Sequence, residues 1–175
     1  LPPELTIKLV PEHIQKRIKR HLPDDERNYG GAVVVFLGVP ESEVAGQDFT
    51  HHQLMQDYAH PLGDGNNMFI SVSSVGDTDS APDGYRAVMI STHTELADWK
   101  YFSAEAYAAH KQAYADKLIH YARRVYPELA THPVVYEIGT PQTYARFTGR
   151  PHGAVGGLRL NLSNANQNAI PHNIG

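Results

Sequence analysis

Two β-rich segments joined by a turn constrain the fold of this chain more than any other feature. The segments "NMFISVSSV" (67–75) and "YRAVMISTHT" (85–94) are rich in residues that favour strands. Between them, "GDTDSAPDG" ends in Pro82-Asp83-Gly84, a combination typical of a tight turn. Further strands are expected in "GGAVVVFLGVP" (30–40), "THHQLMQDYA" (50–59) and "HPVVYEIG" (132–139). Since these strands have short reverse connections and no alternating helices, they predict an α+β fold with a largely antiparallel sheet.

A short basic helix is expected near the start of the sequence, in "LVPEHIQKRIKRHLP" (9–23). Pro11 suits a first helical position, Ile14 and Ile18 lie one turn apart, and Pro23 ends the segment. Its cations are Lys16, Arg17, Lys19 and Arg20. A solvated helix face is the favoured interpretation of this cluster, and contact with a membrane surface is the second.

A longer helix is expected in "FSAEAYAAHKQAYADKLIHYARRVYPEL" (102–129), with Ser103 as its N-cap and Pro127 at its end. Its apolar stripe recurs every three or four residues and consists of Tyr107, Tyr114, Leu118, Tyr121 and Val125. Such a stripe is typical of a helix face that packs on the core. The three tyrosines also suit one wall of an elongated apolar cavity.

The composition excludes several classes of function. The 175 residues suffice for one domain with a core, and a net charge of −4 argues against a nucleic-acid-binding protein. The chain has no cysteine, which excludes disulfides and thiolate chemistry and is compatible with a cytoplasmic protein. No apolar run approaches the length of a membrane span. The eleven histidines raise the question of a metal-dependent hydrolase, but no HExxH or comparable ligand spacing occurs, so we expect no metal site.

The segment "GTPQTYARFTGRPHGAVGGLRL" (139–160) is unusually rich in glycine. Thr140 and Pro141 suit the start of a short helix, and Gly149 suits its end. Capping does not explain the glycines that follow, namely Gly153, Gly156 and Gly157. Backbone pressed against a flat ligand or against a neighbouring strand would account for them. A phosphate-binding loop is excluded, because a GxGxxG fingerprint would need the right spacing and a following helix.

This segment, together with "NQNAIPHNIG" (166–175), resembles the phytoene-desaturase-like branch of the flavin-dependent amine oxidoreductases. That branch includes carotenoid desaturases, carotenoid cis–trans isomerases and retinol saturases. The shared motifs are a TP-x-T-x-x-R-F helix, a G-R-P-x-G-x-x-G-G-type run and an "AIP" segment. The paired strands with their "APDG" turn and terminal "TH" are also similar, so the resemblance covers most of the chain.

The resemblance implies a domain organisation, a cofactor and partners. Residues 1–175 are expected to form a single substrate-binding domain of a longer protein, with a mixed or antiparallel sheet and helices on one face. FAD would be bound in the parent protein, whose missing FAD-binding half carries the GxGxxG and GD motifs, and no FAD is expected on this chain alone. The expected substrate is a carotenoid-like polyene. Peripheral membrane contact and dimerisation through an exposed apolar face are further expectations.

The resemblance also implies site residues. The backbone beside the isoalloxazine ring would consist of Arg150, Pro151, Gly153, Gly156 and Gly157. The helix before it would be fixed by Thr140, Thr143, Arg146 and Phe147. Substrate would contact Tyr107, Tyr114, Tyr121 and Phe147, while no catalytic residue is assigned. Two other functions stay open: a freestanding module that binds an apolar ligand without flavin, and the metal hydrolase.

Overall fold

The computed structural model describes residues 3–22, 25–100, 102–159, 162 and 165. The chain forms two compact units, each described by itself below. The first consists of Leu1–Gly31, Glu95–Lys100 and Pro141–Gly175, and the second of Ala32–Thr94 and Tyr101–Thr140. That residues 1–175 act as one substrate-binding domain stays a prediction. The "NQNAIPHNIG" motif lies outside the described residues.

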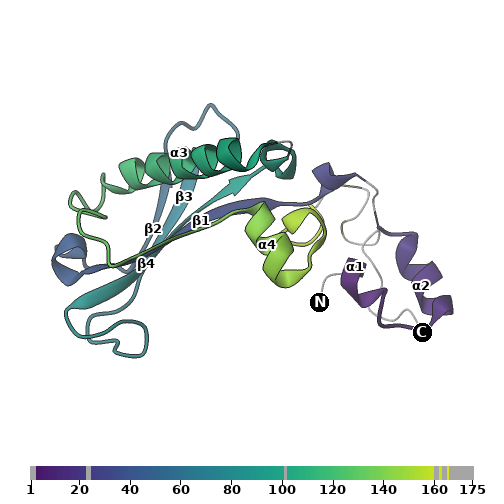
Figure 1. Ribbon diagram of the computed structural model, residues 1–175, viewed down its shortest axis with the longest axis horizontal. Helices are drawn as coiled ribbons and strands as arrows, with labels where there is room; N and C mark the ends of the chain where they lie inside the picture. Colours follow the sequence, from purple (N-terminus) through teal and green to yellow (C-terminus); the bar gives the residue numbers. More distant parts are fainter. Residues whose placement is uncertain (1–2, 23–24, 101, 160–161, 163–164, 166–175) are drawn as a thin grey trace. The chain divides into compact units, whose positions relative to one another are not determined.

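The second unit is built on a five-stranded sheet (Figure 1). Its strands are β1 (Gly31–Pro40), β2 (His51–Met55), β3 (Asn67–Val72), β4 (Tyr85–Thr94) and β5 (Val135–Gly139). Their order across the sheet is β2-β3-β4-β1-β5. The pairs β2–β3, β3–β4 and β1–β5 are antiparallel. This confirms the predicted α+β fold with a mostly antiparallel sheet.

The turn before β4 also forms as predicted. The Tyr85 N–H donates to the Pro82 carbonyl at 3.0 Å, and Gly84 has φ +79°. Glycine adopts this left-handed conformation without the steric penalty that a side chain would bring. The turn directs the chain back into the sheet, so that β3 and β4 pair with Ser71 opposite Met89.

Helix α3 (Ala104–Ala122) lies along one face of this sheet (Figure 1). Ser103 caps its start as predicted, since the Ala106 N–H donates to the Ser103 hydroxyl oxygen at 3.2 Å. The helix ends at Ala122, five residues before Pro127, whereas the sequence predicted that it would continue to the proline. The following residues form tight turns that bring Tyr126 into the core, where its ring is only 2% exposed. Burial of this ring explains the early end of the helix.

The first unit contains short helices and a small apolar core. Its α-helices are α1 (Pro3–Thr6), α2 (Glu12–Lys19) and α4 (Pro141–Thr148), and its 3-10 helices are η1 (Glu26–Asn28), η3 (Leu96–Trp99) and η4 (Pro151–Gly153). Tyr29, Leu96 and Ala154 form the core, with Leu158 packed against it. The Tyr29 hydroxyl bonds to Glu4 Oε1 at 2.5 Å. These contacts join segments that are far apart in the sequence.

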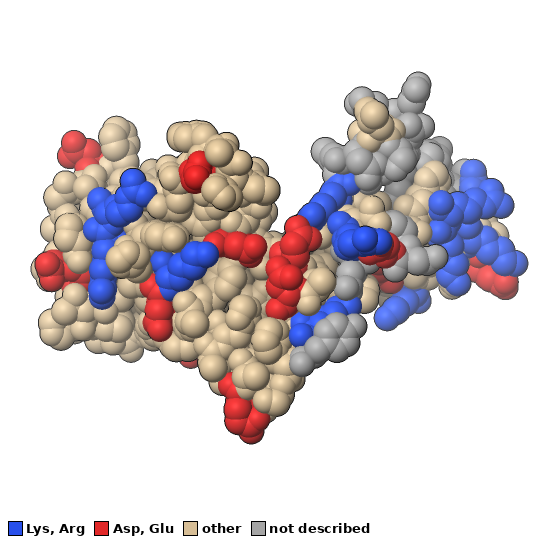
Figure 2. Space-filling model, turned by 90° about the horizontal axis from the view of Figure 1, so that it is seen from above, with Lys and Arg blue, Asp and Glu red and all other residues tan. Residues whose placement is uncertain are grey.

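Helix α2 confirms the basic helix expected near the start of the sequence. Ile18 is buried at 4% exposure, whereas the cations on the other side of the helix are exposed. Figure 2 shows Lys and Arg side chains gathered over this helix. Across the described residues, no helix has both the length and the apolar character that crossing a membrane requires.

Candidate functional site

The second unit has an apolar sheet face that its own helix does not cover. Along β4, Arg86, Val88 and Ile90 are buried, whereas Tyr85 and Met89 are 39% and 37% exposed. Successive side chains of a strand point to opposite faces, so the buried set and the exposed set mark two different faces. The exposed face also carries Phe36 of β1 (42%), Phe69 of β3 (37%) and Val135 of β5 (49%). We call this surface the open face.

Helix α3 covers the opposite face of the sheet. It buries Ala115, Leu118, Ile119 and Ala122. Gln112 Nε2 on this helix donates to the Tyr136 hydroxyl of β5 at 2.9 Å. Tyr136 pairs with Leu37 in the sheet register, and Leu37 is 3% exposed. The same register puts Val135 and Phe36 on the face turned away from α3, which is therefore the open face.

A pocket of about 710 Å³ lies on the open face. It is lined by Phe36, Leu37, Gly38, Ser71, Val72, Ser73, Ser80, Ala81, Pro82, Tyr85, Ala87, Val88, Met89, Val134 and Val135. Ala81 and Pro82 come from the turn before β4, so the predicted turn supplies one wall. Tyr85 is the one residue with an ionisable side chain in this lining. The other polar groups of the lining are serine hydroxyls and backbone groups.

The pocket suits a long apolar ligand and offers little for acid–base chemistry. Apolar side chains provide most of its contact surface, and concave apolar sites of this size are typical of small-molecule binding. One hydroxyl is already engaged, because Ser73 Oγ accepts the Ala87 N–H at 3.1 Å. The arrangement can hold a ligand against the sheet and remove the covered side of that ligand from water. It does not by itself supply a proton donor and acceptor pair.

The tyrosines predicted to contact substrate lie elsewhere in the same unit. Tyr107, Tyr114 and Tyr121 are half-buried on α3, and none of them lines the pocket. The Tyr107 hydroxyl is 2.5 Å from Thr140 Oγ1, and the Tyr114 hydroxyl donates to Asp64 Oδ1 at 2.8 Å. These contacts give two of the tyrosines a role in holding loops to the helix. Their contact with substrate stays a prediction.

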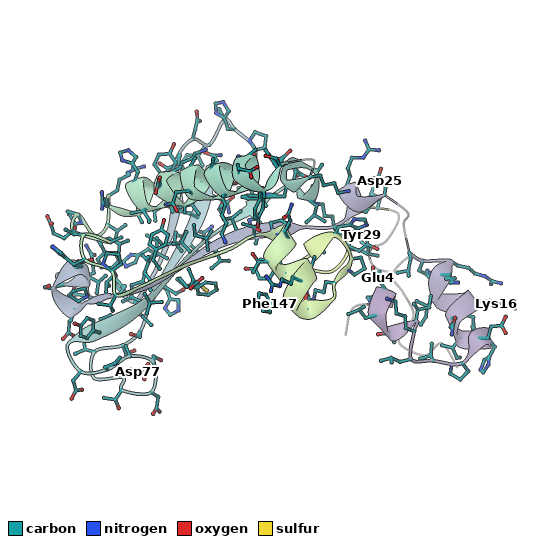
Figure 3. The ribbon with its side chains drawn as sticks, in the orientation of Figure 1. Glu4, Lys16, Asp25, Tyr29, Asp77 and Phe147 are labelled. Carbon is teal, nitrogen blue, oxygen red and sulfur yellow. The ribbon has the colours of Figure 1, made fainter. Side chains whose placement is uncertain are left out.

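Phe147, the fourth residue predicted to contact substrate, belongs to the first unit. It lies on α4 and is 76% exposed (Figure 3). The guanidinium carbon of Arg146 lies 5.4 Å from the centre of its ring. The two side chains thus form a cation–π contact at the surface. Burial raises the pKa of Tyr144, which lies on the same helix.

Gly149 and Gly153 are explained by the fold of the chain itself. Gly149 ends α4 as predicted, with φ +65° and its N–H donating to the Ala145 carbonyl at 3.1 Å. Gly153 has φ +76°, and a Cβ placed there would lie 1.7 Å from the Pro141 carbonyl oxygen. Gly153 is therefore needed because the loop packs directly on the first residue of α4. The flat surface that it approaches is the chain's own backbone.

Gly156 and Gly157 differ from these two positions. Neither has a left-handed φ, both are exposed, and nothing lies within 4 Å of a Cβ placed on either. Within the described residues, then, no contact and no backbone conformation requires glycine here. Arg150 holds the loop before them, since its Nη1 donates to the Val155 carbonyl at 2.6 Å. Pro151 begins the 3-10 helix η4.

A polar pair of the buried Tyr126 and the half-buried His52 lies away from the pocket. The Tyr126 hydroxyl is 2.9 Å from His52 Nε2, and burial raises the pKa of Tyr126. Another histidine, His93, is 3.1 Å from the Asn67 side-chain nitrogen through its Nδ1. No three His, Asp or Glu side chains in the described part of the chain are grouped so that they could hold a metal ion.

Sequence reasoning missed the pocket residues Phe36, Met89 and Val135. A signal was present, because β1 is apolar at both alternating sets of positions and the middle of β4, residues 87–90, is apolar at both as well. A strand with one solvated face should alternate between apolar and polar residues. The excess of apolar residues therefore indicates that both faces of the sheet are apolar. It does not tell which of them the helix covers.

Comparison with known proteins shows that the chain is distantly related to carotenoid isomerases of plants. No protein-family model matches it. Over 147 residues, 77% of this chain, it is 28% identical to a chloroplastic prolycopene isomerase of Daucus carota and 27% identical to that of Arabidopsis thaliana. Those matches cover 23% and 24% of the relatives, so the chain spans about a quarter of their length. The chain is distantly homologous to prolycopene isomerases, which confirms the resemblance to the carotenoid branch of the flavin-dependent amine oxidoreductases.

Proposed function

From this distant homology we propose that the chain is the substrate-binding portion of a FAD-dependent oxidoreductase that acts on a long apolar polyene, as a carotenoid desaturase or isomerase does. The observation that carries the proposal is the pocket of about 710 Å³ on the open face. Its lining suits a hydrocarbon chain better than a polar metabolite. A protein of this branch would require such a surface.

The physical basis of binding is the removal of apolar surface from water. A conjugated hydrocarbon has no group that could bond to a protein donor or acceptor. Its affinity therefore comes from buried area, at roughly 25 cal/mol per Å². Phe36, Met89 and Val135 provide that area on three different strands. Because strands are rigid, the polyene would be held in one orientation with little loss of side-chain freedom.

FAD bound by the rest of a longer chain would supply the electron-pair or hydride chemistry. Gly156 and Gly157 fit a place beside a flat ring, because their backbone is exposed and carries no side chain. Arg150, Pro151 and Gly153 would act on the cofactor through the loop that they shape. In this proposal the chain's own residues hold the polyene and shield it from water, and the exposed backbone of Gly156 and Gly157 faces the flat ring of the cofactor.

The proposal is tested with cis-parinaric acid, a conjugated tetraene whose fluorescence rises in an apolar site. The 175-residue chain should bind it saturably, and Phe36→Asp should weaken binding at least tenfold by putting a charge into the pocket. Phe49→Asp is the matched control, because Phe49 is 74% exposed and does not line the pocket. Equal affinity of the two variants would overturn the proposed location.

The tyrosines of α3 give a competing location in the same assay. Tyr121→Ser should leave binding unchanged if the open face holds the polyene, and should weaken it if the tyrosine stripe does. Loss of binding in Tyr121→Ser together with normal binding in Phe36→Asp would place the ligand on α3. That result would favour the tyrosines predicted from the sequence over the pocket.

A freestanding apolar-ligand module is the second candidate, and the apolar lining of the pocket is compatible with it as well. The two functions differ in the affinity of the chain alone. Sub-micromolar affinity for a polyene would favour a self-sufficient module, and weaker affinity would favour a surface completed by an FAD-binding half. The purified chain should also be colourless, whereas a flavin spectrum with one FAD per chain would contradict the missing-half proposal.

A further inference from the structure

We propose that helix α2 is an electrostatic contact site for a bilayer surface rich in anionic phospholipid. This inference does not depend on the identity of the substrate. It rests on a local concentration of charge, on the exposure of the cations and on an apolar side chain beside them. These features are on the described residues of the first unit.

The positive charge of the chain is concentrated around α2. Five of its 15 Lys and Arg residues, but one of its 19 acidic residues, lie between Lys8 and Arg20. The chain as a whole has a net charge of −4, so this segment opposes the sign of the rest. Acidic residues resume at Asp24, four positions after Arg20. The segment is therefore a confined basic surface on an acidic protein.

The cations are available to a partner. The acidic residue of the segment, Glu12, pairs with Lys16 at 2.9 Å across one helical turn. Arg17, Lys19 and Arg20 are exposed, and among the described residues none of the three has an ion-pair partner. Nearby, Asp25 is bound by Arg27, whose Nε donates to its carboxylate at 2.7 Å. An anionic surface would therefore meet three unpaired cations, Arg17 and Lys19 on α2 and Arg20 at its C-cap.

The buried and the exposed side chains of α2 lie on different sides of the helix, because Ile18 is buried whereas Lys16, Arg17 and Lys19 are exposed. Ile18 is 4% exposed, and Gln15 Nε2 donates to the Val10 carbonyl at 2.9 Å. Before the helix, Leu9 is 71% exposed and stands next to Lys8 in the sequence. An exposed apolar side chain beside a basic cluster suits a lipid surface, where it can enter the boundary between headgroups and acyl chains.

An anionic membrane fits these features better than a nucleic acid. Single-stranded nucleic acids are held by aromatic side chains that stack on the bases, and the segment from Lys8 to Arg20 has no Phe, Tyr or Trp. Affinity for a duplex comes from many phosphate contacts, whereas this segment supplies five cations, of which Lys16 is already paired with Glu12. Clusters of four to eight cations on an amphipathic helix are typical of contact with anionic lipid.

The test is co-sedimentation of the 175-residue chain with vesicles. The chain should bind vesicles of phosphatidylcholine with 30 mol% phosphatidylserine, bind vesicles of phosphatidylcholine alone at least tenfold more weakly, and dissociate at 0.5 M salt, where charges are screened. The double variant Arg17→Gln/Lys19→Gln should lose about 25-fold, since each cation near the surface contributes roughly a factor of five.

A matched variant removes two cations from the second unit, Lys111→Gln/Lys117→Gln, so that the net charge changes equally. It should keep its affinity for the anionic vesicles, and an equal loss would overturn the assignment to α2. Leu9→Ser should lose several-fold in binding at every salt concentration at which the wild type still binds, because an apolar contact is not screened. Wild-type binding that is independent of phosphatidylserine, or displacement of the chain from vesicles by a 20-nucleotide RNA, would also overturn the proposal. The salt and lipid dependence of the wild type tests it even where a variant folds poorly.

Discussion

Replacing Gly153 by alanine should destabilise the first unit more than any other glycine substitution in the segment 149–157. The added Cβ would lie 1.7 Å from the Pro141 carbonyl oxygen and 2.8 Å from the Pro141 Cα, both backbone atoms that no side-chain rotation can move away. Relief requires the loop to separate from the start of α4. The same residue has φ +76°, which alanine adopts only at a cost.

The magnitude follows from these two contributions. A left-handed conformation costs an L-residue about 1–2 kcal/mol. Overpacking a closed contact costs about 1–3 kcal/mol when the surroundings must shift. The free energy of unfolding should therefore fall by about 2–5 kcal/mol in Gly153→Ala. Gly149→Ala isolates the first contribution, since Gly149 has φ +65° with nothing near its added Cβ, and should lose about 1–2 kcal/mol.

Gly156→Ala supplies the third member of the series. With ordinary φ and open space around the added Cβ, it should change stability by no more than about 1 kcal/mol, toward greater stability through a less flexible unfolded chain. Trp99 is the one tryptophan of the sequence and belongs to the first unit, with 1% exposure. Its fluorescence during urea unfolding therefore reports on the unit that contains all three glycines.

The midpoints of the three urea curves should fall in the order Gly156→Ala, Gly149→Ala, Gly153→Ala at similar slopes. If Gly153→Ala unfolded at the same urea concentration as Gly149→Ala, the contact with Pro141 would not be what requires glycine. If Gly156→Ala were the least stable, the division of the glycines into two kinds would be wrong. The open backbone at Gly156 would then have a structural role instead of a binding role.

Three further predictions concern buried and charged groups. Glu43 is 6% exposed, and its carboxylate accepts the N–H groups of Thr131 (3.2 Å) and His132 (2.6 Å). Glu43→Ala should therefore lower the free energy of unfolding by about 2–4 kcal/mol, whereas Glu128→Ala, at an exposed position, should lower it little. Equal urea midpoints of the two variants would contradict this prediction. Hydrogen bonds from Arg27 lower the pKa of Asp25 from 3.8 to about 2, so its stabilising contribution is present above pH 3.8 and is lost as the pH falls through 2. NMR titration should show that pKa and its return toward 3.8 in Arg27→Gln, and an unchanged value would refute the pairing. Burial raises the pKa of Tyr126 above 10.0, so its contribution to stability is present below pH 10 and is lost at higher pH. Between pH 9 and 11, the urea midpoint should therefore fall less steeply in Tyr126→Phe than in the wild type. If the midpoints of both proteins fell in parallel, Tyr126 would not be a cause of the pH dependence.

Local chemistry was sufficient to predict most elements of the fold. The turn at Pro82, the Ser103 cap and the end of α4 at Gly149 all depend on residues within a few positions of one another, and the turn brings β3 and β4 together. Turn, cap and alternation signals are of this local kind. The antiparallel pairs β2–β3 and β3–β4 followed because short reverse connections leave few other pairings, whereas the pairing of β1 with β5 joins segments far apart in the sequence.

The candidate site could not be predicted in the same way, because its determinants are far apart in the sequence. The pocket joins Phe36, Met89 and Val135 from three strands, and its position depends on which sheet face α3 covers. The reason for Gly153 lies twelve residues earlier, at Pro141. The pattern of tyrosines on α3 correctly indicated an ordered helix. Only the structure shows that the hydroxyls of Tyr107 and Tyr114 hold loops.

The exposure of apolar side chains on the open face to water is unfavourable, and this bears on the proposed function. The face of the sheet that the helix does not cover leaves Phe36, Phe69 and Met89 partly hydrated, and exposed apolar surface of this kind usually marks an interaction site. Replacing these residues by polar ones would make the chain more soluble without disturbing the α3 side of the core. We therefore expect an occupant on that face, and the proposed polyene would cover these side chains with apolar surface.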